Sequence, residues 1–131
     1  MKKPLSVAKL KKQADKFFSL LIRTELAEKT DQNGFVSCYT CLVKKFWKEM
    51  QAGHYESRTH NATRFSRKNV KVQCVACNIF KDGNKPVFAL NLIKEYGEGI
   101  LGELRKQARK AKQFTTKELK QMIEEYKSLC K

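Results

Sequence analysis

The amino-acid sequence predicts a small α+β domain, and three observations lead to this prediction. At 131 residues the chain has room for one core with helical extensions. Apolar residues recur at helical spacing near the N-terminus, whereas the pattern between residues 35 and 77 is short and typical of strands. Helical patterns return after residue 85. We therefore expect a single domain over residues 1–131, with an N-terminal helix at 6–30, a compact core at 35–84 and C-terminal helices at 85–131.

The N-terminal helix is predicted from an apolar stripe whose members are separated by lysines. These are Leu10, Ala14, Phe17, Phe18, Leu21 and Ile22. The turn sequence Asp31-Gln32-Asn33-Gly34 should end the helix. Short strands are then expected at 35–37, 46–53 and 69–73, with a loop at 56–68 that is rich in Arg, Ser, Thr and Asn.

Helical elements follow this core. One should begin near Cys77 or Asn78 and end around 82–84, and an apolar stretch covers 86–96. A basic helix is expected at 100–112. The last helix has a clear start, because Thr115 can cap it and Glu118 completes a capping box.

Four cysteines form two Cys-x-x-Cys pairs, Cys38 with Cys41 and Cys74 with Cys77. Zinc prefers four ligands in a tetrahedron, and each such pair offers two thiolates from one tight turn. The alternatives are two disulfides or buried free thiols. Because the N-terminus lacks a secretory signal, we expect a cytoplasmic protein, where paired cysteines more often bind metal. The prediction is a structural Zn²⁺ site at the centre of the core, with no open position for catalysis.

The strongly positive charge predicts a polyanionic partner. Lys and Arg number 28 against 13 Asp and Glu, which gives a net charge of +15. Nucleic acid is the first candidate, and no apolar run is long enough to span a membrane. Basic residues in or beside the loop after His54 are expected to contact DNA phosphates, although a solvated charged face is the alternative. They are Arg58, Arg64, Arg67, Lys68 and Lys71. No familiar recognition helix is evident, so we expect recognition of shape and not of base sequence.

His54 and Asn78 are candidates for a second, catalytic site. Histidine can deprotonate water near neutral pH. The carboxamide oxygen of Asn78 can bind a hard divalent ion such as Mg²⁺ or Mn²⁺, and the neighbouring Cys77 would fix its position. Each residue alone has a simpler explanation, since a lone histidine is often structural and an asparagine can merely cap a helix.

The ordered motifs carry a resemblance to a known family. They are Asp15-Lys16-Phe17-Phe18-Ser19, Ile22-Arg23-Thr24, Cys38-Tyr39-Thr40-Cys41, Gln51-Ala52-Gly53-His54-Tyr55 with Arg58, Arg64-Phe65, Asn69-Val70, Gln73-Cys74, Cys77-Asn78 and Gly83-Asn84. This order resembles the His-Me finger nucleases (HNH, ββα-metal), and most of the chain is similar to the lambdoid phage recombination family NinG, also called Rap.

The resemblance implies a zinc-centred ββα-metal core of the treble-clef, HNH-like type. It also implies an endonuclease that cuts branched, Holliday-junction-like DNA during phage recombination. By the same resemblance His54 is the general base, Asn69 steadies the loop that bears it, and Asn78 binds the catalytic ion. One position departs from the family, because many of its sites have an acidic residue or a histidine where this chain has Gly53.

Another residue must then complete the ion site. Glu56 is our first candidate, with His60, Asn61 and Asp82 as alternatives. A nuclease that cuts two strands symmetrically is expected to be a homodimer. The alternative function is a non-catalytic zinc-containing module that binds DNA or RNA. A purely structural or partner-binding protein would explain the cysteines but not the Gly-His and Cys-Asn pairs.

Overall fold

The computed structural model describes residues 4–130, and its longest element is helix α1 (Val7–Thr30). The Ser6 hydroxyl caps it by accepting a hydrogen bond from the Lys9 N–H at 3.2 Å. Asp31 adopts a left-handed conformation just beyond the last turn, so the predicted turn does end the helix. The apolar stripe forms its buried face, at Leu10, Ala14, Phe18 and Leu21.

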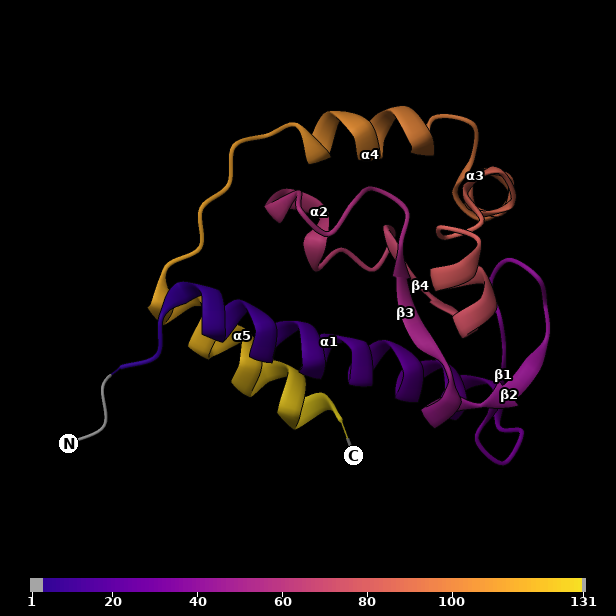
Figure 1. Ribbon diagram of the computed structural model, residues 1–131, viewed down its shortest axis with the longest axis horizontal. Helices are drawn as coiled ribbons and strands as arrows, with labels where there is room; N and C mark the ends of the chain where they lie inside the picture. The colour runs from indigo at the N-terminus through magenta and orange to yellow at the C-terminus, as the bar shows by residue number, and fades with distance from the viewer. Residues whose placement is uncertain (1–3, 131) are drawn as a thin grey trace.

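Helix α5 (Thr116–Leu129) lies along α1, although the two are far apart in sequence (Figure 1). Leu119 and Ile123 of α5 pack against Leu10 and Ala14 of α1. The predicted cap is confirmed, because the Thr115 hydroxyl accepts a hydrogen bond from the Glu118 N–H at 3.1 Å. The C-terminal helix therefore covers the apolar face that the N-terminal helix presents.

Two antiparallel strand pairs follow α1. Strand β1 (Phe35–Ser37) pairs with β2 (Lys44–Phe46), and β3 (Gln51–His54) pairs with β4 (Val70–Gln73). The single strand expected at 46–53 is wrong, because a 3₁₀ turn, η1 (Trp47–Glu49), interrupts it. The turn directs Trp47 onto the core that surrounds the cysteines. Packing of this large aromatic side chain thus overrides the local strand pattern.

The remaining elements surround the second strand pair. A short helix, α2 (Asn61–Arg64), interrupts the expected loop, and a π-helical turn, η2 (Ala76–Phe80), follows β4. Helices α3 (Lys85–Tyr96) and α4 (Ile100–Ala108) pack through Phe88, Leu92, Ile100 and Leu104. Helix α4 is shorter than the expected 100–112 because its buried positions end at Ala108.

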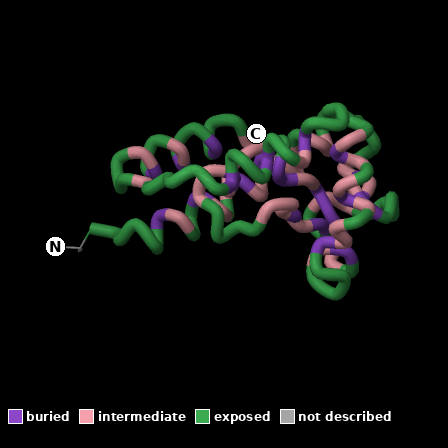
Figure 2. The backbone as a smooth tube through the Cα atoms, turned by 90° about the horizontal axis from the view of Figure 1, so that it is seen from above, coloured by how far each residue is buried: buried purple, intermediate pink, exposed green. Residues whose placement is uncertain are grey.

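Buried residues gather where helices face one another and along the strands, while the outer sides are exposed (Figure 2). Within residues 4–130, no helix combines the length and the apolar character needed to cross a lipid bilayer.

Candidate functional site

The four predicted zinc ligands form one cluster. The Sγ atoms of Cys38, Cys41, Cys74 and Cys77 all lie within 4.8 Å of one another, and those of Cys41 and Cys74 are 3.7 Å apart. A tetrahedral ion with Zn–S bonds of about 2.3 Å separates its sulfurs by about 3.8 Å, whereas a disulfide bond is about 2.05 Å long. The spacing therefore fits a zinc-type metal site and not a pair of disulfides.

Hydrogen-bond donors favour the thiolate form at one of the four sulfurs, that of Cys38. The Cys77 N–H lies 3.5 Å from the Cys74 Sγ, and the Asn84 Nδ2 lies 3.6 Å from the Cys77 Sγ. Burial raises the pKa of Cys38, but backbone N–H donors and the Thr40 hydroxyl outweigh it and lower the pKa to about 6. Burial raises the pKa of Cys41 to about 12 and also raises the pKa of Cys74, so the positive charge of a bound ion would be needed to ionise all four thiols. With four thiolate ligands such an ion would be closed and structural.

Two adjoining open cavities, of about 280 and 420 Å³, lie at the end of β3. Both are lined by Ala52, His54, Arg58 and Asn78. The larger cavity also contacts Ser57, Asp82, Gly83 and Lys85, and the smaller contacts Asp15, Phe18, Ser19 and Gln51. The fold thus brings His54 and Asn78, which are 24 positions apart in the sequence, to one shared hollow.

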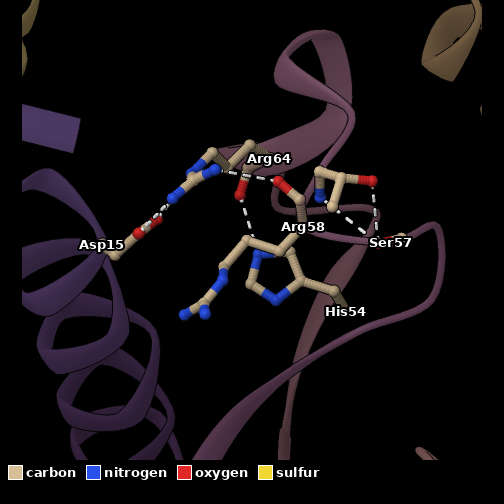
Figure 3. A network of polar contacts seen from close by, with 6 residues as sticks. Asp15, His54, Ser57, Arg58 and Arg64 are labelled. Atoms are coloured by element: carbon tan, nitrogen blue, oxygen red, sulfur yellow. Dashed lines mark hydrogen bonds and ion pairs between the residues drawn. The ribbon is translucent and has the colours of Figure 1, made fainter. Parts of the chain in front are cut away.

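The His54 ring is held in one orientation (Figure 3). Its Nε2 lies 2.9 Å from the backbone carbonyl oxygen of Arg64. A carbonyl can only accept, so Nε2 carries the hydrogen and Nδ1 keeps a free lone pair. Burial lowers the pKa of His54, the carbonyl of Arg64 and the charge of Asp15 raise it, and the charges of Arg58 and Arg64 lower it. The net shift is downward, so the ring is neutral at pH 7 and able to accept a proton.

Arg64 forms an ion pair within the protein, so the phosphate contact that we expected from the sequence is wrong for this residue. Its Nε and Nη2 lie 2.9 and 2.5 Å from the two carboxylate oxygens of Asp15, and its Nη1 lies 3.0 Å from the Arg58 carbonyl oxygen. Only 12% of the side chain is exposed. This bidentate pair fixes α2 against α1 and so places the carbonyl that holds His54 (Figure 3).

Asn69 is fully buried and ties down the loop that follows His54. Its Oδ1 accepts from the Glu56 N–H at 2.7 Å, and its Nδ2 donates to the carbonyl oxygens of Glu56 and Thr63 at 3.0 and 3.2 Å. Glu56 is thereby held through its backbone, and it lines neither cavity. The acidic residue that lines the larger cavity is Asp82, which the sequence offered only as an alternative.

The side chain of Asn78 is also oriented. Its Nδ2 donates to the Gln51 Oε1 at 2.8 Å, which leaves Oδ1 as the remaining acceptor beside the cavity. Lys85, which sequence reasoning missed, lines the same cavity and donates from Nζ to the carbonyl oxygens of His54 and Tyr55. No motif or spacing marks this lysine, because the packing of Phe88 in α3 on Tyr39 and Tyr55 brings it to the site.

Gly53 has a structural explanation. A Cβ atom at this position would lie 1.8 Å from the Oε1 of Gln73. Gln73 is fully buried and donates from Nε2 to the Thr40 hydroxyl at 3.1 Å and to the Gly83 carbonyl at 2.8 Å. Any side chain at position 53 would collide with this buried amide, so Gly53 cannot be replaced there without repacking.

The other basic residues proposed for DNA line neither of the His54 cavities. Arg67 pairs with Glu25 at 3.0 Å and Lys68 with Glu103 at 3.7 Å, both near the surface. The Lys71 Nζ is 3.2 Å from a Glu95 oxygen, and only 15% of the lysine side chain is exposed. Of the five basic residues, Arg58 is the one that lines the His54 cavities.

These features define a small α+β domain that has a cluster of four cysteines able to hold a metal ion, and an open polar cavity lined by His54 and Asn78. The family described as Bacteriophage Lambda NinG protein matches residues 2–131, so the chain belongs to the NinG family. Protein ninG of Salmonella phage P22 is 35% identical over 99 residues, and protein ninG of Escherichia phage lambda is 33% identical over 99 residues.

Each alignment covers 73% of this chain and 45% of the relative, so the chain spans less than half the length of the curated relatives it matches. No solved structure gives a significant match.

Proposed function

We propose that this NinG-family chain is a metal-dependent endonuclease of the HNH, ββα-metal type, acting on branched, Holliday-junction-like DNA in phage recombination. The observation that supports it best is the cavity shared by His54 and Asn78, with the His54 Nε2 fixed on the Arg64 carbonyl. His54 is the last residue of β3, and Asn78 lies in η2, which follows β4, so the two residues come from the first and last elements of a strand–strand–helical-turn unit.

In this proposal His54 is the general base. Its Nδ1 accepts a proton from a water molecule in the cavity, and the resulting hydroxide attacks the scissile phosphorus. The bond from phosphorus to the leaving sugar oxygen then breaks, and that oxygen takes up a proton from solvent water. The Arg64 carbonyl keeps the ring oriented and stabilises the imidazolium that forms. Asn69 acts as a positioning residue, because its three hydrogen bonds fix the loop that leads from His54 to α2.

The residues present fit a hard divalent cation, Mg²⁺ or Mn²⁺. Asn78 Oδ1 and the Asp82 carboxylate would hold it, with Asp82 taking the role that we first gave to Glu56. Mg²⁺ takes about six oxygen ligands and keeps several waters, so two protein oxygens in an open cavity are sufficient. Such an ion supplies positive charge to the phosphate and the leaving oxygen.

Arg58 is the residue we assign to the scissile phosphate, since it lines both cavities and its guanidinium is suited to phosphate oxygens. The net charge of +15 would attract the rest of the DNA backbone. Cleavage of two strands at a junction requires two sites, so a homodimer remains part of the proposal.

The test is digestion of a panel of four-way junctions, flaps and linear duplexes, with Mg²⁺, with Mn²⁺ or without added metal. His54→Ala should reduce metal-dependent cleavage by about 10²–10⁴-fold, because the base is lost, and should leave binding unchanged. The chain has 2 histidines, and His60→Ala is the matched control because its ring is exposed and outside both cavities. Equal turnover by His54→Ala and the parent protein would refute the assigned base.

One observation favours the alternative of a non-catalytic zinc module. Gln73 fills the space where a side chain at position 53 would help to bind the ion. If this function is correct, the parent protein binds branched DNA but cuts no member of the panel with either metal, and His54→Ala behaves identically.

A further inference from the structure

A larger cavity, of about 550 Å³, lies between α2, the segment after α4 and the start of α5. It does not include His54, Asn78 or any cysteine. Its lining combines aromatic, aliphatic, amide and cationic groups, mainly from Asn61, Phe65, Lys110, Lys112, Phe114 and Met122.

The apolar part of this cavity is made by two aromatic rings and a methionine. The rings of Phe65 and Phe114 are half-buried and lie edge-to-face, with centroids 5.6 Å apart. Met122 packs beside them. A flat heteroaromatic ring gains stacking energy on such a surface, whatever its exact identity.

Asn61 forms a polar part of the cavity wall. Its Nδ2 donates to the Lys112 carbonyl oxygen at 2.9 Å, and this bond fixes the orientation of the amide. Its Oδ1 is buried, and no donor within the described residues reaches it. That atom has almost no accessible surface, so the amide forms part of the cavity wall and does not contact the ligand.

The charge at the rim indicates an anionic ligand. Lys110 is exposed at the mouth of the cavity. The acidic residue of the lining, Glu118, is neutralised by Lys112 at 2.6 Å. Cationic groups therefore remain in excess at the opening, in a chain whose net charge is already +15.

We propose that this cavity binds one unpaired nucleobase of a DNA substrate. The base lies against the rings of Phe65 and Phe114, and Lys110 contacts the adjacent phosphate. A base inside a duplex is stacked and paired, so only a branch or a single-stranded end supplies such a ligand. The inference rests on the proposed function and names the feature of branched DNA that the protein recognises.

The location of the cavity connects it to the nuclease site. Asn61 and Phe65 bracket α2, and the carbonyl of Arg64, in the same short segment, holds the His54 ring. The α2 segment therefore contacts the unpaired base and also orients the His54 ring. In this proposal base recognition and cleavage both depend on that one segment.

The test measures binding by fluorescence anisotropy, without divalent metal, to a duplex with a short single-stranded flap and to a fully paired duplex of equal length. Ala111 is exposed and lines the cavity, so Ala111→Trp should fill it without disturbing the core. We expect about tenfold weaker binding to the flap, the size of one lost stacking contact, and less than a twofold change on the duplex. Ala8→Trp, at an exposed alanine outside the cavity, should change neither.

Lys110→Glu is a second variant and should also weaken flap binding more than duplex binding. If Ala111→Trp binds both DNAs as the Ala8→Trp control does, or weakens both equally, the cavity proposal is overturned. Because no cleavage is measured, this result is independent of the nuclease test. If His54→Ala loses cleavage and Ala111→Trp has no effect on binding, the proposal of a base-binding cavity is refuted and the proposal of an endonuclease stands.

Discussion

The cysteine cluster and the His54 cavities share the same β4–η2 segment but differ in how their polar atoms are used. At the cluster, Cys38, Cys74 and Cys77 are buried and their sulfurs face one another. At the cavities, the protein leaves His54 Nδ1 and the Asn78 Oδ1 beside open space. Since Cys77 and Asn78 are consecutive, a closed site on one side of the turn can rigidly position reactive groups on the other.

Gln73 is the residue between the two regions. It precedes Cys74, hydrogen-bonds to Thr40 beside the cluster and blocks the side-chain space at Gly53, directly before His54. The two regions are therefore coupled by packing as well as by sequence. The following predictions test how far each depends on the other.

Loss of the cluster should have the largest effect. Structural zinc contributes about 10–16 kcal/mol in small zinc domains, as much as a typical domain's whole stability of about 5–15 kcal/mol. Cys74→Ser, or a strong chelator, should unfold the strand core and abolish the cavities with it. Circular dichroism and thermal melting check this, with Cys130→Ser as the control outside the cluster. An unchanged melt after verified metal removal would contradict the zinc scaffold.

Gly53→Ala tests the contact between the two regions. The added methyl would meet Gln73 at 1.8 Å, so we expect a loss of about 1–3 kcal/mol in the free energy of unfolding from overpacking. The matched control is Gly102→Ala in α4, where a Cβ meets nothing within 4 Å and helix propensity should improve. Denaturant unfolding measures both, and equal stability of Gly53→Ala and the parent protein would show that the region relaxes freely.

The pH dependence of cleavage tests the cavity alone. Only the neutral His54 ring can act as a base, so the rate should be level above neutral pH and fall about tenfold per unit below its pKa. Burial, aided by Arg58 and Arg64 and opposed by the Arg64 carbonyl and Asp15, lowers that pKa. The decline should begin below about pH 6.5, the ordinary histidine value. A profile of kcat/KM against pH checks this, and a decline that begins above pH 7 would contradict the assignment.

The smallest expected effect concerns a single phosphate contact. Arg58→Ala should reduce the slope of log affinity against log salt concentration by about 1, since one phosphate contact is lost. Arg67→Ala should change the slope less, because Glu25 already pairs with that guanidinium. Anisotropy titrations over a range of salt concentrations measure both slopes. Identical slopes for Arg58→Ala and the parent protein would leave Arg58 without the role proposed here.

Much of the local structure could be predicted from the sequence because its causes are local. The stripe of α1 and the capping box of α5 are set by residues three or four positions apart. The clustering of the four cysteines was predictable for the same reason, since each Cys-x-x-Cys turn is a short-range motif. A tetrahedral ion takes four ligands, so two such turns can meet at one site. The 3₁₀ turn that interrupts the expected strand at Trp47 was not predictable, because Trp47 packs on core residues that are distant in the sequence.

The residues that can bind metal and the starts of α1 and α5 were predictable from the sequence, because those properties depend on side-chain chemistry and on neighbours one turn away. Which charges are free depends instead on contacts between distant elements. Arg64 meets Asp15 across 49 positions, Lys71 meets Glu95, and Lys85 reaches the carbonyl of His54, while Arg58 faces a cavity. The physical reason is that a charged side chain is available to a ligand only if folding has not already given it a partner, and such partners come from elements far apart in the chain.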